Sequence, residues 1–149
     1  MQNLFVPAVL FALPMLVGCG SHASLPGDHE GEEAVKGMRS PSRDDLWSQM
    51  KLVSFHKTKG ETNGDNAYRM EGEFDAELTV DGWWDARSKS VITNNKERQK
   101  LRQDCPVVKI GQRLKGVPTT IDFEKTQKGW RRTAVDLDWG KVDQQLKAH

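Results

Sequence analysis

The chain has 149 residues, of which 36% are hydrophobic and 29% are charged, and its formal net charge is +1. A chain of this length forms one modest domain, which excludes a large enzyme or a multi-domain receptor. The charges are unevenly placed, because the first 18 residues contain no Lys, Arg, Asp or Glu.

Residues 4–17 form an apolar stretch that two prolines interrupt, and it is too short to be a stable transmembrane anchor. It is typical of the hydrophobic region of a signal peptide. The stretch ends in Leu-Val-Gly directly before Cys19, which resembles the lipobox of bacterial lipoproteins. The resemblance implies cleavage after Gly18 and acyl chains on Cys19, which would hold the mature protein on a membrane.

The residue after the lipobox cysteine bears on the destination of the protein. Gly20 stands where Asp is associated with retention in the inner membrane, so we expect the outer membrane, facing the periplasm. The alternative is that residues 4–17 are a short buried helix at the start of the fold. That alternative is disfavoured because no polar face accompanies the apolar run.

Residues 20–41 are rich in Ser, Gly, Pro and acidic residues, a composition typical of a solvated linker. The sequence therefore predicts a signal peptide over 1–18, a lipidated cysteine and flexible linker over 19–41, and one domain over 42–149. Ser42 and Asp45 have the spacing of a helix-capping box. Leu46, Trp47 and Met50 follow at helical spacing and predict a short helix.

The clearest strand signal lies over residues 68–81, where apolar and polar residues alternate throughout. Residues 51–58 place Val53 and Phe55 on one side of an earlier strand, and turn residues at 63–65 join the two as a hairpin. Residues 117–124 and 130–139 predict a second hairpin. Pro118 cannot donate to a ladder, so its strand is expected to begin there or to lie on an edge.

Strands joined by short turns pair antiparallel, and a preceding helix can cover their apolar face. The fold class is therefore predicted to be α+β. We expect a short N-terminal helix packed on an antiparallel sheet of about four strands, arranged as two hairpins.

Several short segments resemble a group of uncharacterised bacterial lipoproteins and secreted proteins. The segments are SFHKTKG at 54–60, YRMEGEFDA at 68–76, KIGQ at 109–112, FEKT at 123–126 and GWR at 129–131. They are similar to the SFxKTxG, acidic-strand and FEKTxxGW segments of that group, in the same order. The resemblance implies no known activity, and His56 stands where the group is expected to have Lys.

Basic residues are concentrated in the second half of the chain. Up to Asp85 there are 14 acidic and 7 basic residues, and from Ala86 onward there are 7 acidic and 15 basic ones. The excess of basic over acidic residues between positions 87 and 115 predicts contact with an anionic lipid or an acidic envelope protein. The alternative is a solvated loop that balances the acidic face of the strand at 68–81. The export signal disfavours nucleic acid as a partner.

Trp83 and Trp84 are adjacent, so on an extended chain they point to opposite faces. At least one of them is therefore expected to be exposed, as a stacking platform for a sugar or an anchor for a protein partner. The alternative is one core Trp with its neighbour on a loop. The segment 87–102 has few sizeable apolar residues, and we expect it to be a mobile basic insertion between the hairpins. The candidate interaction residues are Trp83, Trp84, Arg87, Lys89, Lys96, Arg98, Lys100 and Arg102.

Neither a catalytic residue nor a metal or cofactor site is predicted. Asp28-His29-Glu30 lacks the spacing of a metal motif, and the Gly spacing over 111–116 continues in Val-Pro where a phosphate loop needs Lys and Ser or Thr. With Cys19 lipidated, Cys105 is the one thiol of the mature chain, which excludes an intrachain disulfide.

The leading hypothesis is a lipid-anchored, non-enzymatic envelope protein whose small domain binds another envelope component. One alternative is an immunity or inhibitor protein that blocks a toxin or hydrolase with one face of its sheet. The other is a small cell-wall hydrolase.

Overall fold

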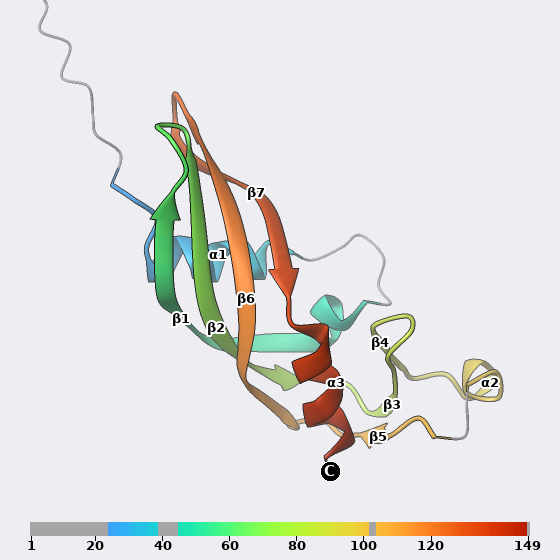
Figure 1. Ribbon diagram of the computed structural model, residues 1–149. Coiled ribbons are helices and arrows are strands. Elements are labelled where there is room, and N and C mark those ends of the chain that lie inside the picture. The colour runs from blue at the N-terminus through green and yellow to red at the C-terminus, as the bar shows by residue number, and fades with distance from the viewer. Residues whose placement is uncertain (1–23, 39–44, 102–103, 149) are drawn as a thin grey trace, which may run out of the picture.

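The computed structural model describes residues 24–38, 45–101 and 104–148, and within these ranges it contains two antiparallel sheets and several short helices (Figure 1). In chain order the elements are α1 (Asp28–Lys36), the 3-10 helix η1 (Leu46–Gln49), β1 (Met50–Thr62), β2 (Ala67–Leu78), β3 (Gly82–Asp85), β4 (Ser90–Ile92), α2 (Asn95–Arg98), β5 (Val107–Val108), β6 (Arg113–Thr126), β7 (Gly129–Leu137) and α3 (Trp139–Lys147).

The main sheet has the strand order β1-β2-β6-β7, with every neighbouring pair antiparallel. The turns of the β1–β2 and β6–β7 hairpins lie together at one end of this sheet, and the smaller sheet and α3 lie toward the other end (Figure 1). The prediction of a mixed fold with a four-stranded antiparallel sheet made of two hairpins is therefore confirmed. The smaller sheet, with the order β4-β3-β5, was not predicted.

The alternation along β2 is confirmed by its burial. Tyr68, Met70, Phe74, Ala76 and Leu78 are each at most 3% exposed, whereas their polar neighbours face solvent wholly or in part. The apolar side of β2 therefore forms the centre of the core, as a period of two requires.

The expectation for Pro118 is wrong, because β6 begins at Arg113 and lies between β2 and β7. The backbone N–H of Asp138 donates to the Pro118 carbonyl at 3.0 Å. The nitrogen and carbonyl of a strand residue point to the same side, so the missing donor of Pro118 faces β7. Strand β7 ends at Leu137, one residue before the position opposite Pro118. The lack of an N–H on Pro118 therefore removes no hydrogen bond of the β6–β7 ladder.

The predictions of a helix after Ser42 and of a flexible linker before it both need correction. The helix expected after Ser42 is the single 3-10 turn η1, whose cap is Asp45, which accepts a hydrogen bond from the Ser48 N–H at 2.9 Å. Ser42 lies outside the described residues. The linker expected over 19–41 is wrong for Asp28–Lys36, because this segment is the helix α1 and buries Gly31, Ala34 and Val35.

Helix α1 packs on the apolar side of the main sheet through a close contact with Phe55. A Cβ atom at Gly31 would lie 2.1 Å from Phe55 Cε1, and one at Gly72 on β2 would lie 2.5 Å from Phe55 Cζ. The two glycines therefore make room for the ring between helix and sheet. At the C-terminal end of α1, the Arg132 guanidinium donates to the carbonyls of Ala34 and Gly37. These hydrogen bonds provide partners for carbonyls that the end of a helix leaves unpaired.

The smaller sheet is fixed to the main one through η1. Gln49 donates from Nε2 to the Val91 carbonyl at 2.7 Å and accepts from the Val91 N–H at 2.7 Å. Its side-chain amide thus takes the place of a neighbouring strand at the edge of β4. The expectation of a mobile insertion over 87–102 is therefore wrong at Ser90–Ile92, which pairs with β3 and buries Ser90 and Val91.

Candidate functional site

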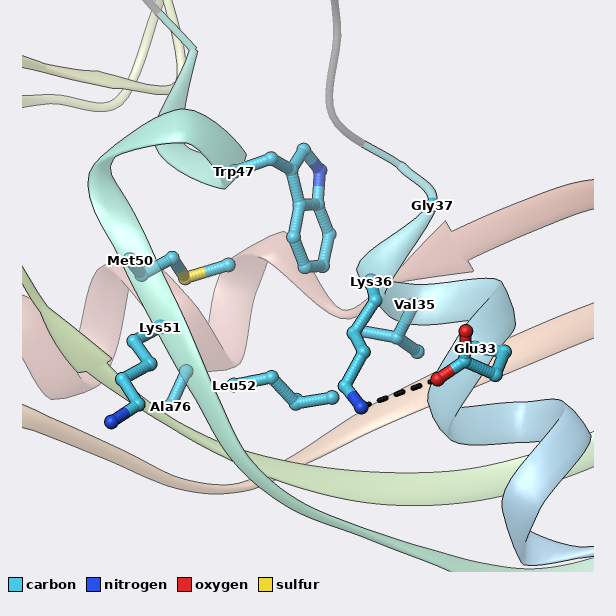
Figure 2. Close-up of a pocket in the computed structure, with 9 residues that line it drawn as sticks. All are labelled: Glu33, Val35, Lys36, Gly37, Trp47, Met50, Lys51, Leu52 and Ala76. Atoms are coloured by element: carbon cyan, nitrogen blue, oxygen red, sulfur yellow. Dashed lines mark hydrogen bonds and ion pairs between the residues drawn. The ribbon is translucent and has the colours of Figure 1, made fainter.

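A cavity of about 520 Å³ lies between α1, η1 and the start of β1. This volume lies within the range of small-molecule sites. Figure 2 shows Val35, Trp47 and Leu52 pointing toward one another across it. The full lining is Glu33, Val35, Lys36, Gly37, Trp47, Met50, Lys51, Leu52 and Ala76.

The apolar wall on β1 depends on an irregularity in that strand. The register between β1 and β2 shifts between Leu52 and Ser54, so Val53 is the extra residue of a bulge. Leu52 opposes Ala76 and Phe55 opposes Phe74, both on the apolar side, while Val53 is 50% exposed. The prediction that Val53 and Phe55 share a face is therefore wrong, because the bulge changes the alternation between them.

Trp47 forms the wall on η1. Its ring centroid lies 5.7 Å from that of Phe74 in a tilted arrangement, which holds the indole against the core while part of it stays accessible. Val35 on α1, which is only 2% exposed, forms the wall of the cavity on the side opposite Trp47. The cavity thus has hydrocarbon and aromatic walls contributed by separate elements.

The charges at the rim are largely balanced. Lys36 Nζ lies 2.6 Å from a carboxylate oxygen of Glu32 and 3.2 Å from one of Glu33. The hydrogen bond with Glu32, followed by that with Glu33, raises the pKa of Lys36, so this amine stays protonated and paired. Lys51 lies on the lining through its backbone, and its side chain points away from the cavity in Figure 2.

The two tryptophans predicted as interaction residues have different environments. Trp84 is 1% exposed and its Nε1 donates to Asp143 Oδ1 at 2.9 Å, so it is a core residue and not a contact surface. Trp83 is partly exposed, and the Arg98 guanidinium lies 4.3 Å from its ring centroid. The prediction that the pair divides between core and surface is confirmed.

The predicted basic residues are exposed but are not all placed together. Lys96, Arg98 and Lys100 lie on and just after α2, and of these Arg98 lies over the Trp83 ring. Arg87 and Lys89 lie in the turn between β3 and β4, where Lys89 Nζ is 4.7 Å from the Trp139 ring centroid. Cys19 and Arg102 lie outside the described residues.

Sequence reasoning missed the cavity between α1 and β1. Trp47 and Met50 stood out as the apolar face of a short helix, but Val35 fell within a segment interpreted as linker. Leu52 occupies a position that the expected alternation over residues 51–58 assigned to the polar face of the strand. A bulge interrupts the alternation of a strand, and a helix that buries so few apolar residues has no clear apolar face. Neither feature gives a sequence pattern strong enough to predict the cavity.

Within residues 24–38, 45–101 and 104–148, no helix combines the length and hydrophobicity that crossing a bilayer requires. Within the same residues, no cluster of His, Cys, Asp and Glu is arranged to hold a metal ion.

The chain matches no protein-family model, no curated protein and no solved structure. The resemblance to the lipoprotein group with SFxKTxG and FEKTxxGW segments therefore stays a prediction.

Proposed function

We propose that this protein is a lipid-anchored binding protein of the bacterial envelope. In this proposal, the cavity between α1 and β1 receives the hydrocarbon chain of an envelope lipid. The observation that carries the proposal is the apolar lining formed by Val35, Trp47 and Leu52. Burial of a chain there is favoured by about 0.8 kcal/mol for each methylene group removed from water.

The rim favours an uncharged group over an ion. Lys36 is already paired with Glu32 and Glu33, so an incoming carboxylate or phosphate would meet two like charges beside one engaged amine. A hydrocarbon chain requires no such partner.

Binding of the uncharged apolar dye N-phenyl-1-naphthylamine, and its displacement by an uncharged long-chain alcohol, tests this function. Leu52→Asn should weaken dye binding at least about tenfold, because it places an unpaired amide in the apolar wall. Val53→Asn is the matched control, since this neighbour is 50% exposed on the other side of the strand. A urea titration of both variants separates lost binding from lost folding. Equal dye binding by folded Leu52→Asn and the parent would contradict the proposal.

The anchor is tested separately. Cys19→Ala should leave the protein unlipidated, with a higher mass than expected for a cleaved chain and with release from the membrane fraction. Unchanged mass and fractionation in that variant would refute the lipid anchor without affecting the cavity.

A second candidate function is inhibition of a basic hydrolase by the open face of the main sheet. This face, opposite α1, carries the exposed Glu71, Glu73 and Asp136 around a shallow depression of about 450 Å³. Assays against a panel of basic cell-wall hydrolases should show inhibition that Glu73→Lys abolishes. Absence of inhibition across the panel would leave the lipid-binding function as the better account.

A further inference from the structure

A row of apolar side chains crosses the solvent side of the smaller sheet. Trp83 on the central strand β3 is paired with Ile92 on β4 and with Val107 on β5. Directly opposed residues of antiparallel strands project from the same face, so the three side chains form one row. Val107 is 50% exposed, and Trp83 and Ile92 are partly exposed.

The other side of the same sheet is fully covered. Trp84, Val91 and Val108 are between 0% and 2% exposed and belong to the core. The small sheet is therefore covered by the core from beneath, while its outer row faces solvent. An apolar row that stays in contact with water favours an interaction surface.

Helix α2 places the cation Arg98 beside this row. The Arg98 guanidinium lies over the Trp83 ring at 4.3 Å, and Lys96 and Lys100 are exposed close by in the chain. Among the described residues, no carboxylate forms an ion pair with any of these three cations. Their charges are thus available to an anionic partner.

We propose that this Trp83 face, defined as Trp83, Ile92 and Val107 with Arg98 over the indole, docks on the surface of an anionic bilayer. Lys96 and Lys100, exposed on the same segment, supply further positive charge. A Trp flanked by aliphatic side chains settles at the level of the lipid headgroups, and Arg and Lys beside it contact the phosphates. The cations are long and exposed, so they can adjust to headgroups that present no fixed shape.

A bilayer suits this face better than an acidic protein does. The apolar part is a single narrow row, and the cations lie on one four-residue helix and the turn after it, whereas a protein interface is centred on well-packed pockets. The inference rests neither on the cavity between α1 and β1 nor on acylation of Cys19, so its failure would leave both of those proposals standing.

The test uses the chain from residue 20 onward, which keeps every described element and lacks both the apolar leader and the acylated cysteine. Sedimentation with vesicles of phosphatidylcholine, with and without phosphatidylglycerol, measures binding. We expect binding to the phosphatidylglycerol vesicles that weakens steeply as salt is added, and little binding to phosphatidylcholine alone.

Two variants of equal charge change locate the contact. Replacing Lys96, Arg98 and Lys100 by Gln should weaken binding about 100-fold. Replacing Lys59, Lys125 and Lys128 by Gln removes the same charge from the hairpin end of the main sheet and should change binding less than about threefold. Trp83→Ser should also weaken binding while circular dichroism shows an unchanged fold.

Three outcomes would overturn the proposal. Equal losses in the two triple variants would show that net charge alone attracts the vesicles. Equal binding to both vesicle types would show that phosphate charge is not recognised. No sedimentation with either vesicle would leave an acidic protein as the better partner for the Trp83 face.

Discussion

Trp84 and Asp143 join the smaller sheet to the C-terminal helix, because the buried indole Nε1 of Trp84 donates to Asp143 Oδ1 at 2.9 Å. Burial opposes ionisation of Asp143, but hydrogen bonds from Lys147 and Trp84 outweigh it and hold its pKa below the ordinary value. One carboxylate thus satisfies the single polar atom of the largest buried side chain and also pairs with Lys147 on its own helix.

The first prediction concerns this hydrogen bond. Asp143→Ala leaves the Trp84 N–H without its partner inside the protein, which should lower the free energy of unfolding by about 1 to 3 kcal/mol. Asp143→Asn keeps an acceptor oxygen, so it should lower the free energy of unfolding much less. Urea titration measures both variants. Equal losses would mean that the charge of Asp143, and not its acceptor, stabilises the fold.

The second prediction is a pH dependence at the main sheet. Arg69 donates to Asp122 at 2.7 Å and 3.1 Å, and this bonding is the main cause that lowers the pKa of Asp122 below its ordinary value of 3.8. A carboxyl whose pKa is lower in the folded state stabilises the fold above its unfolded pKa. That contribution is lost as pH falls through the folded-state value.

Asp122→Asn should therefore reduce the free energy of unfolding by about 0.2 to 1 kcal/mol near neutral pH, as expected for an exposed pair. It should have no effect once the pH lies well below the folded-state pKa. Urea titrations of the parent and the variant at neutral and acidic pH give the comparison. A constant difference across the whole range would contradict the role of this ion pair.

The third prediction tests the packing of α1. Alanine is intrinsically favoured over glycine in a helix by about 1 kcal/mol. Gly31→Ala should nevertheless lower the melting temperature, because its Cβ would lie 2.1 Å from Phe55 Cε1. In a Phe55→Leu background the same substitution should be neutral or stabilising. A higher melting temperature for Gly31→Ala alone would show that α1 does not pack on Phe55.

The fourth prediction concerns the edge of the smaller sheet. Gln49→Ala removes the partner of both the N–H and the carbonyl of Val91, at a cost of about 1 to 3 kcal/mol for each buried group left unpaired. Gln144→Ala, at an exposed position on α3, is the control and should be nearly silent. Native-state hydrogen exchange should also become faster at Ser90–Ile92 in Gln49→Ala. Unchanged exchange there would mean that β4 is held without Gln49.

Elements whose signal is local could be predicted from the order of the residues alone. The alternation of β2 and the turn residues after β1 and β6 specify two hairpins, because a period of two and a tight turn need only neighbouring residues. Adjacent Trp83 and Trp84 were assigned to opposite faces for the same reason. Which of them is buried could not be read locally, since the choice depends on Asp143, 59 positions along the chain.

The tertiary structure decided what depends on distant partners. Helix α1 has few apolar residues and several acids, and it is stabilised by burial of Val35 and by the contact of Gly31 with Phe55, which no local pattern reveals. The cavity needs walls from α1, η1 and β1, and the bulge at Val53 turns Leu52 into it. Packing between elements supplies more free energy than local propensity, so such sites appear only when the chain has folded.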